Sequence, residues 1–184
     1  RLIGSTPLQI ELTLVNMINH ISKNAPVMHM ESFYKKFSSI SKQKFDGLVI
    51  TGAPIEHLEF EEVNYWNELK EIFKWSQSNV HSTMAVCWGA MAMMNFFHKL
   101  PKYPLKKKAF GCFEHVNLVP EHKFMRGFAD RVTIPVSRWS EIRQSDLEQR
   151  KDLEILLSSH ELGPCLIDDR NHNAVYMINH LEYD

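Results

Sequence analysis

The stretch Ser82-Thr-Met-Ala-Val-Cys87-Trp-Gly-Ala-Met91 contains the point around which we expect the fold to be built. A short apolar run ends at Cys87, and a helix-compatible segment, residues 90–99, follows Gly89. A strand that turns into a helix at a nucleophile must bend sharply, which requires small neighbours such as Gly89 and Ala90. The stretch is therefore typical of a nucleophile on a strand-to-helix turn, or of a buried structural cysteine at a strand end.

The helix that follows Cys87 has two expected chemical consequences. Its unpaired N–H groups and dipole favour a thiolate, so we expect the pKa of the Cys87 thiol to be lowered. The same N–H groups, starting with that of Trp88, are candidates for stabilising an oxyanion.

Apolar periodicity on either side of Cys87 predicts an α/β fold. The run at residues 48–50 is apolar on both faces, as in a parallel sheet that is covered by helices. No repeat or low-complexity linker divides the chain, so we expect residues 1–184 to form a single domain. We expect strands at residues 8–14, 45–51, 110–119, 131–136, 153–157, 165–167 and 174–178, with 110–119 and 131–136 as an antiparallel extension, and helices at 31–40, 63–77 and 90–99.

Composition argues against several functional classes. The formal net charge of −1 gives no broad basic field for nucleic acid or an anionic membrane, and no apolar run is long enough to span a bilayer. Three cysteines without paired spacing fit a reducing, cytoplasmic compartment. The ten histidines show no recognisable ligand spacing, so no metal site is expected.

His180 and Glu182 lie two residues apart after a predicted strand. In an extended segment their side chains point the same way, and a carboxylate beside an imidazole fixes its tautomer. Together with Cys87 they form a candidate Cys-His-Glu set, provided that the two strand ends are neighbours. The alternative is that both are ordinary surface residues.

Five motifs in order along the chain carry a resemblance to a known family. The sequence is similar to the homoserine O-acyltransferases of methionine biosynthesis that are built on the class I glutamine amidotransferase-like fold. The resemblance implies a flavodoxin-like, mostly parallel sheet with helices on both faces, a homodimer, and relatives that are longer at both ends. The motifs are Gly52-Ala-Pro-Ile-Glu56 through Trp66, Cys87-Trp-Gly-Ala, Gly111-Cys-Phe-Glu-His115, Pro135-Val-Ser-Arg138 and His180-Leu-Glu-Tyr-Asp184.

In that family a cysteine takes the acyl group from acyl-CoA, and the hydroxyl of L-homoserine attacks the thioester. The resemblance implies that Cys87 is the nucleophile, His180 the general base and Glu182 its orienting partner. It also implies substrate-binding roles for Lys108 and Ser137. The neighbouring guanidinium of Arg138 suits the carboxylate of homoserine, although an exposed structural role fits it as well.

Glu56 stands where the family distinguishes acyl donors. Members with Glu at this place resemble acetyltransferases, and members with Gly use succinyl-CoA. A fixed carboxylate would repel the free carboxylate of a succinyl group by roughly 4 kcal/mol at 4 Å and an effective dielectric near 20. We therefore expect acetyl-CoA as the co-substrate, with no further cofactor.

The sequence departs from the family pattern at Met91, Val136 and Trp139, where polar groups are usual. These changes favour one alternative, an inactive relative that acts as a binding module. A homoserine O-succinyltransferase and a class I glutaminase-like enzyme also remain open. We interpret Cys112 as a core residue and Cys165 as structural.

Overall fold

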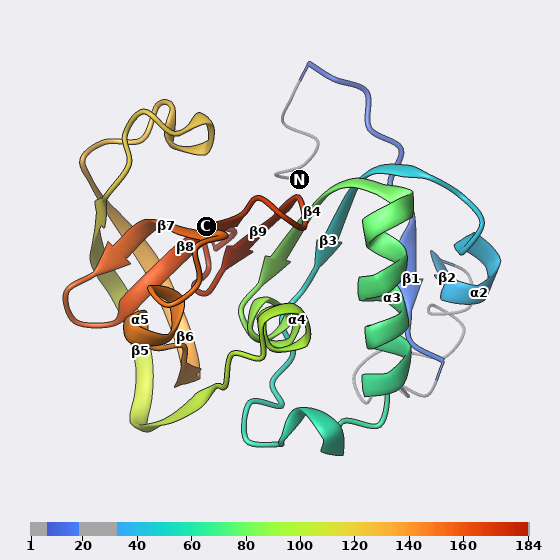
Figure 1. The fold of residues 1–184 in the computed structure, drawn as a ribbon, viewed down its shortest axis with the longest axis horizontal. Helices are drawn as coiled ribbons and strands as arrows, with labels where there is room; N and C mark the ends of the chain where they lie inside the picture. Colours follow the sequence, from blue (N-terminus) through green and yellow to red (C-terminus); the bar gives the residue numbers. More distant parts are fainter. Residues whose placement is uncertain (1–6, 19–32, 184) are drawn as a thin grey trace.

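The computed structural model describes residues 7–18 and 33–183 (Figure 1). Within them lies a seven-stranded sheet with the order β3-β4-β9-β8-β7-β5-β6. Its strands are β3 (Phe45–Ile50), β4 (Val80–Val86), β5 (Tyr103–Asn117), β6 (Arg131–Glu141), β7 (Leu153–Ser159), β8 (Gly163–Asp169) and β9 (Ala174–Met177). The remaining elements are β1 (Leu14–Asn16), β2 (Tyr34–Lys36), α2 (Phe37–Ile40), η1 (Phe60–Glu62), α3 (Trp66–Asn79), α4 (Trp88–His98), η2 (Lys123–Met125) and α5 (Gln144–Leu147).

The parallel part of this sheet consists of β3, β4 and β9. β4 pairs with β3 on one side and with β9 on the other, in register from Thr83↔Ala174 to Val86↔Met177. Because the carboxyl ends of parallel strands meet at one edge of a sheet, the residues that follow β3, β4 and β9 converge there.

The other strands add antiparallel pairs, which confirms the predicted antiparallel extension of β5 and β6. This part of the sheet is curled (Figure 1). Although β6 is the last strand in the order of the sheet, it lies beside the segment that follows β9. The backbone N–H of His180 donates to the carbonyl of Pro135 in β6 at 3.0 Å. The curl therefore places β6 beside the carboxyl ends of the parallel strands.

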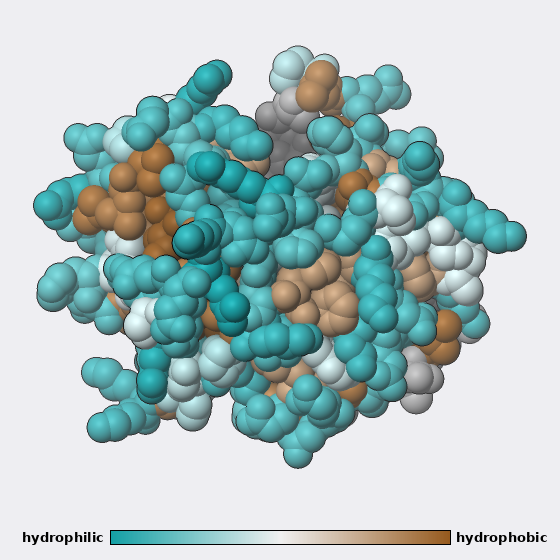
Figure 2. All heavy atoms as spheres, in the orientation of Figure 1, coloured by the Kyte–Doolittle hydropathy of each residue, from teal (hydrophilic) through white to brown (hydrophobic). Residues whose placement is uncertain are grey.

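Helices α3 and α4 pack on the same face of the parallel strands (Figure 1). Their apolar side chains recur at helical spacing and form one core with Ala85 of β4; the buried set includes Trp66, Leu69, Phe73, Trp88, Met91 and Met94. On the opposite face, Val49 and Met84 remain 49% and 37% exposed. Figure 2 shows the molecular surface as mainly hydrophilic, with apolar patches near the centre and at the left of the view.

Three expectations are wrong in detail. The strand predicted at residues 8–14 is only the short β1, and Leu8, Ile10 and Leu12 are exposed, because no described element covers their apolar face. The helix predicted at 31–40 is β2 followed by one turn, α2, while residues 31 and 32 lie outside the described part. Cys112 is exposed in β5 and does not belong to the core.

Candidate active site

Cys87 forms the predicted sharp turn between β4 and α4. It is the residue before the first turn of α4, and its φ and ψ are 52° and −121°, a conformation that residues other than glycine rarely adopt. Its backbone N–H donates to the carbonyl of Met177 at 2.7 Å, which ties it to the end of β9. Backbone strain held by surrounding contacts is characteristic of functional sites, and Cys87 shows this combination.

Two glycines allow the chain to approach the turn closely. A Cβ at Gly89 would lie 2.8 Å from the carbonyl oxygen of Thr51, and one at Gly52 would lie 3.0 Å from the Cβ of Cys87. Real Cβ atoms do not tolerate the first distance, so α4 can begin at this place only with glycine at 89. This confirms the need for a small neighbour at Gly89 and adds Gly52.

The Cys87 thiol is protonated at neutral pH, contrary to the sequence-based expectation. Burial raises the pKa of the thiol to about 11, and the charge of Glu56 adds to this increase. The backbone N–H of Trp88 acts in the expected direction and lowers the pKa, as does the charge of Arg138, but burial outweighs them. The thiol therefore needs a base before it can attack.

The candidate base is His180, which is 8% exposed and directly follows the segment after β9. Its Nδ1 lies 2.6 Å from Glu182 Oε1, and its ring stacks on Tyr183 with centroids 4.3 Å apart. A carboxylate only accepts, so Nδ1 carries the proton and Nε2 is left as the acceptor. The two side chains meet through a turn rather than an extended strand, because the backbone N–H of Tyr183 donates back to the carbonyl of His180 at 3.5 Å.

The fold brings the candidate nucleophile and the candidate base to the same edge of the sheet. Cys87 follows Val86, which pairs with Met177 in the adjacent parallel strand, and His180 lies three residues beyond Met177. Burial is the main cause of the raised pKa values of Cys87 and Tyr183, and the charge of Glu182 adds to both increases. The condition set by the sequence, that the two strand ends are neighbours, is met.

Glu56 joins this group from the loop after β3. Its Oε1 accepts the backbone N–H of Trp139 at 3.1 Å, and its carbonyl accepts Lys102 Nζ at 2.9 Å. The first contact holds the carboxylate of Glu56 and the second holds its backbone. The negative charge of this carboxylate adds to the effect of burial in raising the pKa of Cys87.

Arg138 is 1% exposed, and its guanidinium is occupied by the protein. Nε donates to Asn179 Oδ1 at 3.1 Å, Nη1 to the Ser140 carbonyl at 2.7 Å and Nη2 to the Leu162 carbonyl at 2.8 Å. Each of its three nitrogens therefore already donates to a protein oxygen.

Ser137 and Lys108 lie on the hairpin of β5 and β6. Ser137 is partly buried opposite Phe110, and Lys108 is exposed with its Nζ 5.1 Å from the centre of the Phe110 ring. Of the departures from the family pattern, Met91 and Val136 are buried in the core, whereas Trp139 is 51% exposed.

Two histidine and carboxylate clusters, which sequence spacing did not reveal, could hold a metal ion. One contains His98, Asp169 and His172, and the other contains His122, Glu154 and Asp168; within each, the ligand atoms lie within 4.8 Å of one another. In the first cluster the Asp169 carboxylate already faces both imidazoles at 2.6 and 2.8 Å, so hydrogen bonds explain the arrangement without an ion.

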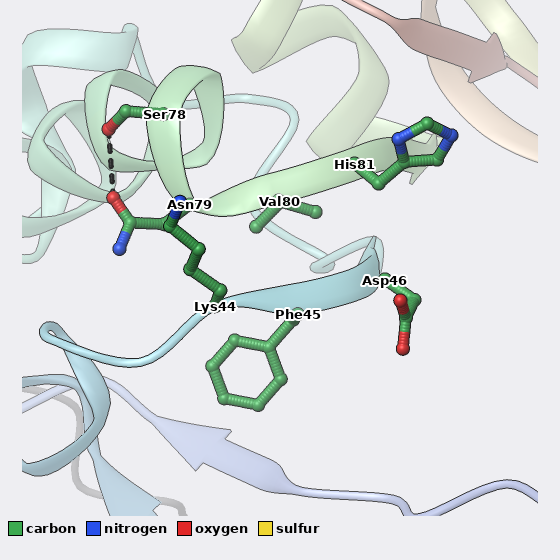
Figure 3. Close-up of a pocket in the computed structure, with 7 residues that line it drawn as sticks. All are labelled: Lys44, Phe45, Asp46, Ser78, Asn79, Val80 and His81. Carbon is green, nitrogen blue, oxygen red and sulfur yellow. Dashed lines mark hydrogen bonds between the residues drawn. The ribbon is translucent and has the colours of Figure 1, made fainter.

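Two hollows are lined by residues other than Cys87, although the second includes Met177, whose carbonyl accepts the Cys87 N–H. One, of about 340 Å³, opens at the amino ends of β3 and β4 and is lined by Lys44, Phe45, Asp46, Ser78, Asn79, Val80 and His81 (Figure 3). The other, of about 500 Å³, runs across the exposed face of the sheet that carries Val49 and Met84. Ligands of open α/β sheets bind at the carboxyl ends of the strands, so neither hollow is the candidate active site.

Among the described residues, no helix is both long and apolar enough to cross a membrane.

Comparison with known proteins identifies the relatives of the chain. A family model described as homoserine O-succinyltransferase matches residues 1–184. Over these 184 residues the chain is 57% identical to a homoserine O-acetyltransferase of Roseobacter denitrificans and 56% identical to one of Dinoroseobacter shibae. The match covers 100% of this chain and 60% of each relative, so the chain spans about three fifths of the length of these curated relatives.

Solved structures confirm the fold class. The chain resembles a putative GMP synthase subunit from Thermoplasma acidophilum with a TM-score of 0.64 and 16% identity, over 94% of this chain and 84% of that one. It resembles a glutamine amidotransferase from Thermotoga maritima with a TM-score of 0.59 and 13% identity, over 72% and 55% of the two chains. The α/β, class I glutamine amidotransferase-like fold is therefore shown.

Proposed function

Because the chain belongs to the homoserine O-succinyltransferase family, we propose that it transfers an acetyl group from acetyl-CoA to the hydroxyl of L-homoserine through a thioester on Cys87. The observation that carries the proposal is the strained turn at Cys87, with the His180–Glu182 pair at the end of the adjacent strand. Such a set of nucleophile, base and orienting carboxylate serves acyl transfer.

In the first half of the reaction, His180 Nε2 accepts the thiol proton of Cys87, and the thiolate attacks the carbonyl carbon of acetyl-CoA. The backbone N–H of Trp88 stabilises the oxyanion that forms. The C–S bond to CoA breaks, the acetyl group stays on Cys87, and the CoA thiolate takes the proton back from His180. Glu182 stabilises the imidazolium during this exchange.

In the second half, His180 takes the hydroxyl proton of L-homoserine as the oxygen attacks the Cys87 thioester. The Cys87 thiolate leaves and regains that proton. A thiol with a pKa near 11 suits this cycle, because the resting enzyme then carries a neutral pair and generates the thiolate only as the proton moves.

Acetyl-CoA is proposed over succinyl-CoA for two reasons. The similar relatives from Roseobacter denitrificans and Dinoroseobacter shibae are named homoserine O-acetyltransferases. In addition, the Glu56 carboxylate is held close enough to Cys87 to raise its pKa, so it would also face the free carboxylate of a succinyl thioester.

Lys108 and Ser137 are proposed to bind substrate, and Arg138 is proposed to shape the site rather than to contact substrate. The exposure of Lys108 leaves its ammonium available to an anionic group. We further propose that the chain acts as one domain in a cytoplasmic homodimer.

Intact mass spectrometry tests the covalent route. After mixing with acetyl-CoA alone, the full chain should gain one acetyl group, which L-homoserine removes, and Cys87→Ala should gain none. A folded protein without an adduct would contradict the transferase proposal. Release of ammonia from L-glutamine would instead support a glutaminase, the activity of one of its structural neighbours.

A further inference from the structure

A network of buried polar side chains connects two strands, β5 and β6, to the residue before His180. Asn179 is 0% exposed; its Oδ1 accepts Arg138 Nε at 3.1 Å, and its Nδ2 lies 2.9 Å from Nε2 of His115, which is also 0% exposed. His115 Nδ1 in turn lies 2.9 Å from the carbonyl oxygen of Phe113. These hydrogen bonds thus form a network that runs from β5 through Asn179 to β6.

The directions of these hydrogen bonds are fixed from both ends. The Phe113 carbonyl can only accept, so Nδ1 of His115 carries the hydrogen and Nε2 of the neutral ring must accept. Asn179 therefore presents its NH₂ group to His115. At the other end Arg138 can only donate, which requires the Asn179 oxygen to face it. Both ends demand the same amide orientation.

The backbone around Asn179 crosses from one strand to another. The N–H of Ile178 donates to the Cys165 carbonyl of β8 at 2.7 Å, and that of His180 donates to the Pro135 carbonyl of β6 at 3.0 Å. Between these two contacts, the side chain of Asn179 is the anchor that sets where the chain turns and hence how His180 leaves the sheet.

We propose that Asn179, held by His115 and Arg138, is a positioning residue that sets the orientation of His180 towards Cys87. The inference rests on the proposed function of His180 as the base. It assigns a task to Arg138 and His115, which lie outside the Cys-His-Glu set.

Burial and the charges around this hydrogen-bond network favour a neutral His115. Burial lowers the pKa of His115, the hydrogen bond to the Phe113 carbonyl acts against this, and the charge of Arg138 lowers it further. Arg138 itself interacts with Glu141 and Glu56 and with the thiols of Cys165 and Cys87. The Cys165 thiol, whose pKa burial raises to about 12, also bonds to Asn179.

Alkylation of Cys87 by iodoacetamide tests the inference without any acyl donor. The full chain is treated at pH 7.5, and peptide mass spectrometry follows Cys87, with the exposed Cys112 as the internal reference. His180→Gln should slow Cys87 about 100-fold, because no base then takes its proton. Asn179→Leu should slow Cys87 about 10- to 100-fold and leave Cys112 unchanged, because a base that is out of place transfers protons poorly.

Tyr176→Phe is the matched control. Tyr176 lies in β9, the strand that precedes Asn179, and its hydroxyl donates to Asp169 Oδ2 of β8 at 2.7 Å, so the change also removes a buried hydrogen bond, but away from His180. The rate at Cys87 should stay within about twofold of the unmodified chain, because general destabilisation does not misplace the base.

Asn179→Asp gives a second, pH-dependent test of the positioning role, and it replaces Asn179→Leu as the test if that variant does not fold. The carboxylate still accepts from Arg138, but it can accept from His115 only after that ring gains a proton. The Cys87 rate relative to the unmodified chain should therefore rise as the pH falls from 9 to 6. A slow His180→Gln with an unaffected Asn179→Leu, or a flat ratio for Asn179→Asp, overturns the positioning role. An unaffected His180→Gln refutes the base itself, and with it both proposals.

Discussion

The backbone N–H of Trp139 donates to Glu56 Oε1 at 3.1 Å, which joins the edge strand β6 to the loop after β3. The two residues are 83 positions apart in the sequence. The contact holds the Glu56 carboxylate where it acts on the Cys87 thiol. Because the donor is the main-chain N–H of Trp139, replacing the side chain at this position does not remove the hydrogen bond.

Removal of the Glu56 charge should change the acyl donor preference. Glu56→Gly should raise kcat/KM for succinyl-CoA relative to acetyl-CoA by up to about 1000-fold, the equivalent of roughly 4 kcal/mol of relieved repulsion. Glu56→Gln keeps the acceptor for Trp139 and removes the charge, so it should show most of this effect. The exposed Glu61→Gln is the control, and an unchanged donor ratio in both Glu56 variants would refute the assignment.

Loss of the Glu182 carboxylate should impair proton transfer by His180 and leave substrate binding nearly unchanged. Glu182→Gln replaces the acceptor 2.6 Å from His180 Nδ1 with an amide that can favour the wrong tautomer. We expect kcat to fall about 10³- to 10⁴-fold with little change in KM. Steady-state kinetics measure the split. Tyr183→Phe keeps the ring that stacks on His180 and should stay within about threefold of the parent.

Gly89 should tolerate no side chain. In Gly89→Ala the new Cβ would lie 2.8 Å from the Thr51 carbonyl oxygen, so α4 or β3 must move, at a cost of about 1–3 kcal/mol in the free energy of unfolding. In Gly47→Ala the nearest atom to the new Cβ is 3.9 Å away, so that variant should be neutral or slightly stabilised. Urea unfolding compares the two, and equal stabilities would contradict the close approach.

The intrinsic pKa of Cys87 should appear once its base is removed. In His180→Gln, the alkylation rate of Cys87 should rise about tenfold per pH unit and level off near pH 11, because burial and Glu56 disfavour the thiolate. Adding Glu56→Gln should move the midpoint to lower pH. A plateau below pH 8 would show that the helix N-terminus outweighs burial.

The neutral state of His115 should make the protein less stable in acid. Its pKa is lowered in the folded chain by burial first and by Arg138 further, so below the ordinary pKa of about 6.5 the unfolded chain binds the proton better. This share of the free energy of unfolding is present above pH 6.5 and is lost as the pH falls through the folded value. His115→Gln should flatten that part of a stability curve measured by urea unfolding, and an identical curve would contradict the prediction.

The elbow at Cys87 was predictable because it depends on local geometry. A strand, Cys87 and Gly89 lie within ten residues, and sterics at the turn permit few alternatives. The contact between His180 and Glu182 was predicted on the basis of an extended segment, whereas a turn brings the two side chains together. The strand predicted from the alternation between Leu8 and Leu14 was wrong, because this period produces a half-buried strand only where another element covers its apolar face.

Local patterns in the sequence were enough to predict the α/β class, the position of the bend and the residue types of the candidate site, since strand and helix periodicity and turn sterics act over short range. Packing between distant segments set two further features, the protonation of Cys87 and the hydrogen bonds of Arg138. The first follows from burial and the Glu56 charge, and the second from the curl that brings β6 to Asn179. Desolvation and long-range hydrogen bonds depend on what packs around a group, and residues distant in the sequence supply that packing.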